Sequence, residues 1–570
     1  MVTRLFIAVL LFFPFFSVAQ EYIYPQGVFR EPMDLPIELS GSFSELRSVN
    51  FHSGIDVRVI NRPHRRVYAV GDGYVSRIKV EPAGYGNALY ITHPQGYVSV
   101  YAHLDFFSSD VAALIKKIQY EKQQFHIDVY FPPDSLHVKK GEVIGIAGNT
   151  GYSFGAHLHF ELRDAITEET IDPLLFGFKV NDISVPQFRE LKLYAHGTSL
   201  INDKNRHIIY KTPRQSSGKY SIPVIPTASG AVSFGFEILD KQNSTNPNRL
   251  GLKFLKVYVD DSLLVDIRFE RLDFAVVRHQ LAYIDYPERE RSKKRFQRSW
   301  KKPGNNLPHY KFIRDDGILY INENKHYRVK CVIQDIGGNE AELLFSINGR
   351  VGSNHNFDIQ CNDEASVFRW DSMCTWAGNY SQVLMDKGAL FSDECVFIRE
   401  SETSLSEFAP RLDIISDEAL AGFYRIRLMP IQMSDDIGGM TIAQLGEKGV
   451  LNGITTTFSN GWFEGRTRSF GKFVLVRDTL PPEIKPQKIP ATGSVTGLKK
   501  ISFKVTDDIC GIADYNAYIN GEWILLEYSL KDDEMFYIID DKMPAGESVF
   551  RLVVTDRCGN EAVWEMNLKL

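Results

Sequence analysis

The stretch GAHLHFELRD, residues 155–164, indicates a β-strand that carries polar chemistry on one face. Successive side chains of a strand point to opposite faces, so residues two apart share a face. His157 and His159 would then point one way. The alternating apolar side chains would point the other way, into a core: Leu158, Phe160 and Leu162. Two histidines do not make a site by themselves, so the rest of the chain must supply partners.

Residues 20–180 continue in the same style, as short strands between glycine turns. VYAVGDGYVSRIKV and ALYITHPQGYVSVYAHL are rich in Val, Tyr and Ile, and PQG in the second predicts a hairpin turn. VKKGEVIGIAGNTG places glycines where a compact β-domain would turn. One helix is expected as an insertion in SSDVAALIKKIQYEKQQF, where four apolar residues have helical spacing: Val111, Leu114, Ile115 and Ile118.

Candidate partners for the two histidines lie upstream. FHSGID, residues 51–56, places His52 and Asp56 four apart, and YAHLD adds His103 at the end of an aromatic-rich strand. Zinc sites use histidine nitrogen and carboxylate oxygen, and a hydrolytic site has three protein ligands and leaves the fourth position to water. The five candidates exceed what one catalytic zinc requires, so some of them must serve the reaction instead of the metal.

These segments together resemble a known family. FHSGID, VYAVGDGYV, GYGNALYITH, YAHL, VKKGEVIGIAGNTG and GAHLHFELR occur in this order within about residues 45–175. In this the chain resembles the M23 zinc metallopeptidases, also called LytM or lysostaphin-type endopeptidases, which cut peptides in bacterial cell walls. The resemblance implies an antiparallel β peptidase domain. H-x-x-x-D followed by H-x-H is a far more specific signal than either motif alone.

Carried over residue by residue, the resemblance implies that His52, Asp56 and His159 are the zinc ligands. It also implies that His103 and His157 are catalytic histidines that do not bind the metal. Three ligands leave Zn²⁺ an open position for a water whose pKa falls towards about 7. One free histidine can take a proton from this water, and the other can stabilise the oxyanion or protonate the leaving amine. The sequence leaves open which histidine has which role.

Other residues near these motifs have weaker support. Glu161 shares the face of the two histidines and could support them from behind the metal, but an ordinary exposed glutamate is the favoured interpretation. Of fourteen histidines, four lie in motifs and the other ten are interpreted as structural or surface residues. Ala156 stands where many relatives have proline, and segment 106–137 is longer than in compact members. Cleavage specificity is therefore not inherited from the family.

The C-terminal two thirds predict β-sandwiches. VIQDIGGNEAE (332–342) and VVTDRCGNEAV (553–563) share the pattern V-x-x-D-x-x-G-N-E-A, which suits a tight turn in an immunoglobulin-like domain. The prolines of RDTLPPEIKP (477–486) mark a boundary. The expected order is a mainly β chain with these parts: signal peptide 1–19, peptidase domain 20–180, β-sandwich-like domain 181–352, β-rich middle domain 353–480 and immunoglobulin-like domain 481–570.

All six cysteines lie in the C-terminal half, without the paired spacing of a zinc ribbon. Cys510 and Cys558 are the first pair to test for a disulfide, although free thiols are a comparable alternative. The basic run RERSKKRFQRSWKK (289–302) could be a patch for an anionic envelope polymer. A solvated loop is the favoured interpretation of this run.

The N-terminus MVTRLFIAVLLFFPFFSVAQ has one positive charge, an apolar run and small residues before position 20, as in a secretory signal cleaved after Ala19. We therefore expect a periplasmic or secreted protein without a membrane span. The formal net charge of −6 gives no reason to expect nucleic acid as a partner.

The sequence thus favours a secreted zinc metalloendopeptidase that hydrolyses peptidoglycan stem peptides or cross-links, with Zn²⁺ as cofactor. The alternative is a non-catalytic LytM-type regulator or scaffold for another wall hydrolase. Such proteins resemble the family but typically lose metal ligands, whereas all five positions are filled here. A third hypothesis is a wall-binding or adhesive role of the β-domains, which could also contact envelope proteins.

Overall fold

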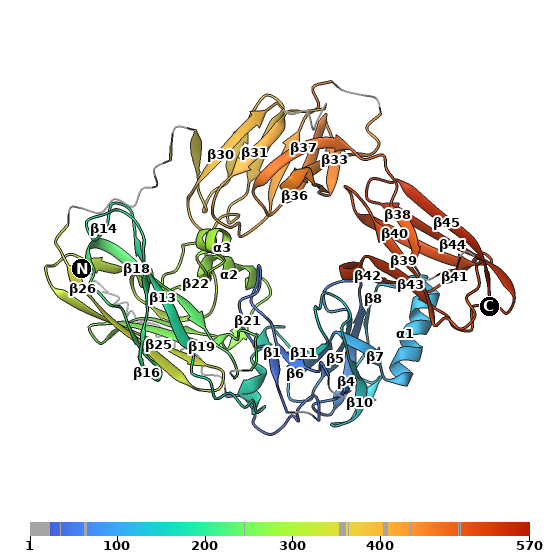
Figure 1. Cartoon of the computed structure of the whole chain (residues 1–570), viewed down its shortest axis with the longest axis horizontal. Helices are drawn as coiled ribbons and strands as arrows, with labels where there is room; N and C mark the ends of the chain where they lie inside the picture. Colours follow the sequence, from blue (N-terminus) through green and yellow to red (C-terminus); the bar gives the residue numbers. More distant parts are fainter. Residues whose placement is uncertain are drawn as a thin grey trace, which may run out of the picture.

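The computed structural model describes residues 23–570 apart from 35, 62–64, 244, 353–358, 360, 363, 403–407, 433–435, 488 and 491. The expected signal peptide lies outside the described residues. Four β-rich bodies follow one another around a closed ring, coloured blue, green, orange and red in chain order (Figure 1). The chain is mainly β, as predicted.

The N-terminal body contains two sheets and the one helix expected from the sequence. The larger sheet has antiparallel neighbours in the order β1 (Leu39–Gly41), β2 (Ile55–Arg58), β11 (His157–Asp164), β6 (Tyr97–Ala102), β5 (Asn87–Thr92), β4 (Gly73–Val80), β8 (Ile127–Tyr130), with β9 (His137–Val138) on β4 and β12 (Thr170–Ile171) on β11. The smaller sheet has the order β3 (Arg66–Tyr68), β10 (Val143–Ala147), β7 (Leu104–Phe107). The PQG turn joins β5 to β6, as predicted.

The predicted helix is α1 (Ser109–Lys122), and it buries Val111 and Ile115 against this domain. It ends at Gln123, which adopts a left-handed conformation. Its other side faces the last body of the chain, where the Tyr120 and Trp523 rings meet edge to face with centroids 5.3 Å apart. Lys116 and Asp540 form an ion pair across the same contact, so the first and last bodies touch and close the ring (Figure 1).

The second body is built around one continuous sheet. The strands of this sheet are β13 (Gln187–Ala195), β14 (Leu200–Ile201), β15 (Ile208–Lys211), β16 (Arg214–Ser216), β17 (Lys219–Ser221), β18 (Thr227–Leu239), β19 (Leu252–Val259), β20 (Ser262–Arg268), β22 (Phe296–Arg298), β23 (Tyr310–Ile313), β24 (Leu319–Ile321), β25 (His326–Asp335) and β26 (Glu340–Gly349). The short strand β21 (Arg271–Leu272) belongs to the larger sheet of the first body. β18 pairs with β13 on one side and, at its first residues, with β26. One hydrophobic cluster takes side chains from both halves of this sheet.

The first two bodies interlock. Phe43 and Phe51 precede the first metal-ligand candidate in sequence, yet they are buried in the hydrophobic cluster of the second body. The Phe51 ring contacts those of Phe269 and His309, with centroids 5.7 and 5.2 Å apart. In addition, β12 of the first body pairs with β21 of the second. The second body therefore holds the segment that leads into His52.

The basic run 289–302 is not a solvated loop, so that prediction was wrong. It begins in α3 (Tyr286–Ser292), which follows α2 (Gln280–Tyr283), and continues through β22. Arg298 and Lys302 are each only 3% exposed, and both lie 3.0–3.4 Å from a carboxylate oxygen of Glu418 in the third body. A buried charge needs such a partner because desolvation is costly. Much of this basic charge therefore joins two domains.

The third body packs two sheets against each other. Their strands are β27 (Ala365–Phe368), β30 (Glu394–Ser401), β31 (Arg411–Ile415), β37 (Gly471–Arg477), β33 (Met440–Leu445) and β34 (Leu451–Gly453) in one, and β28 (Cys374–Ala377), β29 (Ser381–Met385), β32 (Tyr424–Leu428), β36 (Trp462–Thr467) and β35 (Thr456–Ser459) in the other. A disulfide joins Cys361 to Cys395, with Cα atoms 5.5 Å apart.

The fourth body is a sandwich of two four-stranded sheets. They have the orders β38 (Glu483–Gln487), β39 (Lys500–Thr506), β43 (Glu534–Ile538), β42 (Glu527–Ser529), and β41 (Glu522–Ile524), β40 (Ile512–Ile519), β44 (Glu547–Asp556), β45 (Glu561–Lys569). The disulfide considered in the sequence, Cys510–Cys558, is present. Cys331 is a buried free thiol and Cys374 a partly exposed one. The immunoglobulin-like assignment stays a prediction.

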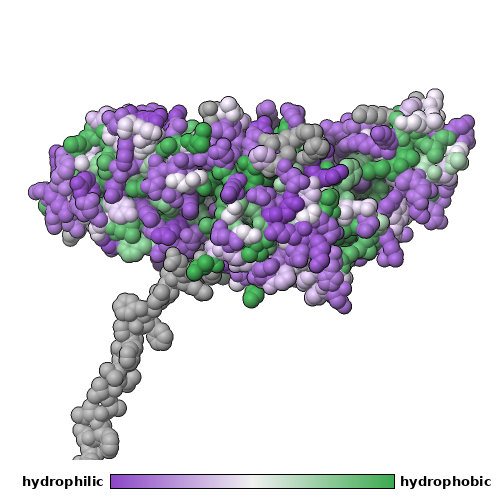
Figure 2. Space-filling model, turned by 90° about the horizontal axis from the view of Figure 1, so that it is seen from below, coloured by the Kyte–Doolittle hydropathy of each residue, from purple (hydrophilic) through white to green (hydrophobic). Residues whose placement is uncertain are grey.

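Among the described residues, no helix combines the length and the apolar character needed to cross a membrane. Figure 2 shows one face covered mostly by hydrophilic side chains, with smaller hydrophobic groups between them. Scattered apolar side chains of this kind are normal on a protein surface.

Candidate metal centre

Three neighbouring strands bring the motif residues together. β11 lies between β2 and β6, and His159 faces Asp56 on one side and Ala102 on the other. His103 directly follows β6, so it reaches the same place. Leu158, on the opposite face of β11, is completely buried in the core. The strand alternation predicted from the sequence is therefore confirmed, and it puts His157 and His159 on one face.

Three of the five predicted site residues converge on one point. His52 Nε2 lies 3.0 Å from Asp56 Oδ1 and 3.0 Å from His159 Nδ1, and His159 Nδ1 lies 2.9 Å from Asp56 Oδ1. All three residues are buried, with exposures of 4–7%. Two imidazole nitrogens and one carboxylate oxygen at such spacing form a set of atoms that one metal ion could bind.

The opposite atoms of these side chains are already occupied. His52 Nδ1 donates to the Ser42 carbonyl at 2.8 Å, which leaves Nε2 free to bind a metal. Arg47 donates to Asp56 Oδ2 at 2.7 Å and leaves Oδ1 on the side of the histidines. Hydrogen bonds that fix ring orientation and tautomer in this way are typical of metal-binding histidines and carboxylates.

Glu161 is not an exposed glutamate, so the favoured sequence interpretation was wrong. It is completely buried, and its Oε1 accepts a hydrogen bond from His159 Nε2 at 2.9 Å. Tyr85 and Arg163 also donate to its carboxylate, at 2.6 and 2.7 Å. Burial raises the pKa of Glu161, but Arg163 and His159 outweigh burial and lower it. The carboxylate therefore stays charged and holds His159 from behind.

His103 and His157 lie beside the three converging residues. In each of these two rings Nδ1 is bonded to the backbone and Nε2 is not. Each Nδ1 donates to a backbone carbonyl, that of Thr150 at 2.8 Å for His103 and that of Gly155 at 2.7 Å for His157. Their ring centroids are 4.8 Å apart. His103 has a positive φ of 59°, a strained conformation that is uncommon outside glycine and that clusters at functional sites. Neither Nε2 atom donates to these carbonyls, and His157 Nε2 lies 3.5 Å from Asp56 Oδ1.

The charges of the histidines differ strongly. Burial and, to a smaller extent, the neighbouring His159 and His157 lower the pKa of His103 to about 3. His103 is therefore neutral at physiological pH. Burial also lowers the pKa of His159, but hydrogen bonds to Asp56 and Glu161 outweigh burial and raise it to about 9. A metal binding at Nδ1 of His159 would replace that proton.

Several supporting residues could not be found from the sequence motifs. Arg47 and Tyr85 lie outside the histidine motifs, and only the fold brings them to Asp56 and Glu161. Gly54 illustrates a local requirement that the sequence does show. A Cβ at this position would lie 2.3 Å from the carbonyl oxygen of Phe160, so the close approach of the chain beside β11 needs glycine.

The donor set fits zinc. Histidine nitrogen and carboxylate oxygen are common zinc ligands, and three of them correspond to a catalytic site. His103 and His157 are not among the three residues whose ligand atoms converge, although their Nδ1 atoms, like that of His52, donate to backbone carbonyls. The structure therefore brings together all five residues predicted from the motifs and adds Glu161 and Arg47 behind them.

Two parts of the chain match known families. Residues 50–173 match the sequence model of Peptidase family M23, and residues 365–478 match that of a Zu5-like domain. The first range contains all five predicted site residues, whereas the second covers most of the third body.

Curated relatives are similar over the same N-terminal region. DD-carboxypeptidase/endopeptidase Mpg of Neisseria meningitidis serogroup B is 33% identical over 129 residues, 23% of each chain. Peptidoglycan DD-endopeptidase ShyB of Vibrio cholerae is 36% identical over 112 residues, 20% of each chain. The match thus spans about a quarter of the length of these relatives or less.

Solved structures with similar folds include a zinc-containing peptidase from Vibrio cholerae. It is 26% identical, with 26% of this chain and 37% of that chain covered and a TM-score of 0.17. The catalytic domain of lysostaphin from Staphylococcus simulans is 24% identical, with 24% and 87% covered and a TM-score of 0.18.

Proposed function

We propose, from the M23 peptidase domain at residues 50–173, that this chain is a zinc metalloendopeptidase that hydrolyses peptide bonds in peptidoglycan stem peptides or cross-links. One observation carries the proposal. Three candidate metal-binding atoms converge within 3.0 Å of one another, and two further histidines lie beside them, with His157 Nε2 3.5 Å from Asp56 Oδ1.

The hydrogen bonds of these residues indicate a different role for each of them in the proposed reaction. His52, Asp56 and His159 would hold Zn²⁺, which when bound supplies a Lewis acid and a water molecule of lowered pKa. His103 is neutral, so its Nε2 can accept a proton from the attacking water or stabilise charge on the substrate. His157 is oriented in the same manner and can perform the complementary step. Glu161 and Arg47 keep His159 and Asp56 in position.

The substrate class is proposed from the family and from relatives whose names include peptidoglycan DD-endopeptidase. Export to the periplasm or the cell exterior is part of the proposal and follows from the signal-like residues 1–19. The three C-terminal bodies would then hold the peptidase domain in the envelope. Comparing the N-terminus of the mature protein with the predicted cleavage after Ala19 tests export.

A regulator or scaffold without catalysis is the alternative. It loses support because no metal-binding position is replaced and because the hydrogen bonds behind the ligands are also present. A protein that binds its partner only through the shape of the fold does not require the buried ion pair of Glu161 and Arg163 behind His159.

The test measures zinc content and release of peptides from purified peptidoglycan for the wild type, His159→Ala and His103→Ala. We expect zinc bound by the wild type and by His103→Ala, but not by His159→Ala. Peptide release should fall in both variants, and mass analysis of the wild-type products would identify the bond that is cut.

The matched control is His137→Ala, because His137 is an exposed histidine of the same domain at the sheet edge. Zinc content and digestion should remain unchanged in this control. A wild type that binds zinc but releases no peptide would favour the regulator. A His159→Ala variant that digests normally would contradict the proposed site.

A further inference from the structure

Three buried aspartates meet at the joint between the first two bodies, in a group separate from the histidines. Asp182 lies in the linker that leads into the second body, Asp240 follows β18 and Asp335 ends β25. One oxygen of each lies within 4.8 Å of those of the others. We call these three residues the acidic cluster.

The cluster contains buried oxygens without partners. Asp240 is 3% exposed, Asp182 9% and Asp335 0%. Neither carboxylate oxygen of Asp240 has a hydrogen-bond partner, and neither does Oδ2 of Asp182. An unpaired buried carboxylate is among the most costly groups in a folded protein. The unpaired carboxylate of Asp240, beside an unpaired oxygen of Asp182, indicates that something positively charged belongs there.

The protein itself does not supply that charge. Among the ion pairs of the described residues, none involves a member of the acidic cluster. Burial, together with the charges of Asp335 and Asp182, raises the pKa of Asp240 to about 8. Burial and Asp335 likewise raise the pKa of Asp182 to about 7, against a hydrogen bond from the Ser184 backbone.

The surrounding turn holds the aspartates close together. Asp335 opens the first D-x-x-G-N-E-A turn, and its two oxygens accept hydrogen bonds from the backbone and side chain of Asn339 at 2.8 and 3.0 Å. Asn339 also donates to the Asp182 carbonyl at 3.3 Å. A Cβ on Gly337 would lie 2.7 Å from the Cβ of Asp182, so glycine here allows the linker to approach the turn.

We propose that the acidic cluster is a Ca²⁺ site that joins the peptidase domain to the second body. Oxygen-only ligands select hard cations, and the cluster has no nitrogen or sulfur ligand for zinc. Calcium–oxygen bonds of about 2.3–2.6 Å place two ligands of one ion up to about 5 Å apart, which matches this cluster. Mg²⁺ usually keeps several waters, whereas these three side chains are at least nine-tenths buried.

An ion there would connect segments that are distant in the chain. Gln242, two residues after Asp240, donates to the carbonyls of Ile37 and Asn181 at 3.2 and 3.3 Å and accepts from the Leu39 amide at 2.8 Å. These contacts tie β1 and the linker to the loop after β18. Because β1 pairs with β2, which carries Asp56, the calcium site would fix the joint that supports the zinc-binding strand.

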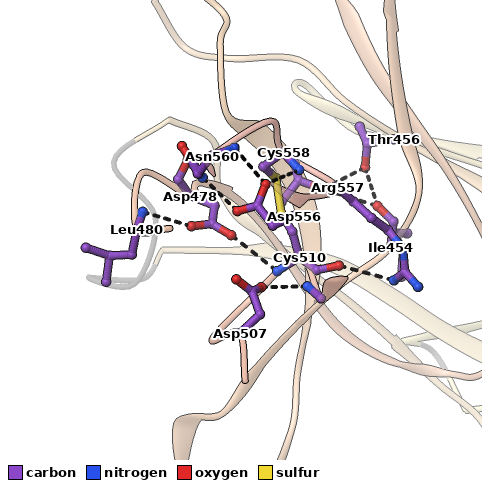
Figure 3. Close-up of a disulfide and its surroundings, with 12 residues drawn as sticks. Ile454, Thr456, Asp478, Leu480, Asp507, Cys510, Asp556, Arg557, Cys558 and Asn560 are labelled. Atoms are coloured by element: carbon purple, nitrogen blue, oxygen red, sulfur yellow. Dashed lines mark hydrogen bonds between the residues drawn. A yellow bond between two sulfur atoms is a disulfide. The ribbon is translucent and has the colours of Figure 1, made fainter. Parts of the chain in front are cut away.

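The second D-x-x-G-N-E-A turn has the same hydrogen bonds from its asparagine as the first, but the acidic side chains around it differ. Asp556 accepts two hydrogen bonds from Asn560, at 2.9 and 2.8 Å, and Asn560 also donates to the Asp478 carbonyl at 3.2 Å. Figure 3 shows Asp478 and Asp507 directed at the backbone beside the Cys510–Cys558 disulfide. Asp507 is partly exposed, so the proposal is confined to the first joint.

The test titrates Ca²⁺ into the full mature chain after divalent cations have been removed and zinc restored. Calorimetry should show one Ca²⁺ bound per chain. The midpoint of thermal unfolding should rise by at least about 3 °C at saturation, because a ligand of the folded state stabilises it by mass action. Mg²⁺ at the same concentration should give a much smaller rise.

The variant Asp240→Asn should lose the response to Ca²⁺. Its unfolding midpoint without calcium should be no lower than that of the wild type, because the substitution removes a carboxyl group whose ionisation is costly in the buried cluster. Asp172→Asn is the matched control. Asp172 is also a buried aspartate of this region, but it is bonded to the Leu174 amide and lies outside the cluster. The control should keep the full response.

Further outcomes decide the proposal without ambiguity. His159→Ala should retain calcium binding, which separates this site from the zinc centre and from the proposed function. A wild type without a calorimetric or thermal response to Ca²⁺ overturns the proposal even if Asp240→Asn fails to fold. An unchanged response in Asp240→Asn, or an equal response to Mg²⁺, overturns it as well.

Discussion

The metal centre and the acidic cluster both gather three buried side chains with ligand atoms, but they balance charge differently. At the metal centre Asp56 pairs with Arg47, and Glu161 pairs with Arg163. In the acidic cluster three carboxylates face each other without a basic partner among the ion pairs of the described residues. The first arrangement can exist before the metal binds, whereas the second needs either protons or a cation.

The difference in charge balance between the two places indicates what each ion would contribute to the protein. A preformed site with its own charge balance leaves the ion free to do chemistry. An uncompensated cluster at a domain joint would use the binding free energy of the ion for stability. The same substitution at the two places should therefore change different properties.

The largest effect is expected for Asp56→Asn compared with Asp240→Asn. Asp56→Asn removes a zinc ligand. One proton-transfer group contributes about 10²–10⁴-fold to a reaction rate, and the rate of hydrolysis should fall by more than this. Asp240→Asn should keep zinc and hydrolysis in the presence of calcium. Zinc analysis and digestion assays on both purified variants check this prediction, and equal loss of activity in both would break the comparison.

A smaller effect is expected for Glu161→Gln. The amide keeps the shape but loses the charge that orients His159 and balances Arg163, so zinc affinity or activity should fall by about 10–100-fold. Zinc competition with a chelator measures the affinity. Unchanged affinity and activity would mean that the hydrogen bond between His159 and Glu161 has no functional role.

The acidic cluster should make the stability of the calcium-free protein depend on pH. The folded state holds protons on Asp182 and Asp240 up to about pH 7 and 8, whereas unfolded aspartate releases its proton near about pH 3.9. The folded state therefore binds more protons between these limits, and stability falls as pH rises. The contribution is fully present below about pH 4 and lost above about pH 8.

Subtracting the unfolding midpoints of Asp240→Asn from those of the wild type, without calcium, isolates this contribution from other groups. From pH 5 to pH 8, the unfolding midpoint of the wild type should fall relative to that of Asp240→Asn. Saturating Ca²⁺ should abolish the decline, because the ion binds the deprotonated carboxylates. A difference that is independent of pH would contradict the proposed charge state of the cluster.

The smallest effect is expected for Asp507→Asn in the second copy of the turn. Asp507 is partly exposed and its Oδ2 accepts a hydrogen bond from the Gly511 amide, so only its Oδ1 is buried without a partner. The calcium-dependent shift of the unfolding midpoint should change by less than about 1 °C. A loss as large as that of Asp240→Asn would extend the calcium proposal to the second joint.

Much of the metal centre could be predicted from the sequence because it depends on local periodicity. Strand alternation puts His157 and His159 on one face whatever the rest of the chain does. The H-x-x-x-D and H-x-H motifs name four of the residues that the fold brings together, and YAHLD supplies the fifth, His103. The helical spacing around Val111 and the turn between β5 and β6 are local features in the same sense.

What surrounds these residues was decided only by the tertiary structure. Burial of Glu161, the pairing of Arg47 with Asp56 and the burial of Arg298 depend on which segments pack together, and charge alone suggested solvent exposure for two of them. The acidic cluster unites a linker, a loop and a strand end. The sequence fixes the direction of side chains along one strand, but the solvation of a charge depends on neighbours that only the folded chain provides.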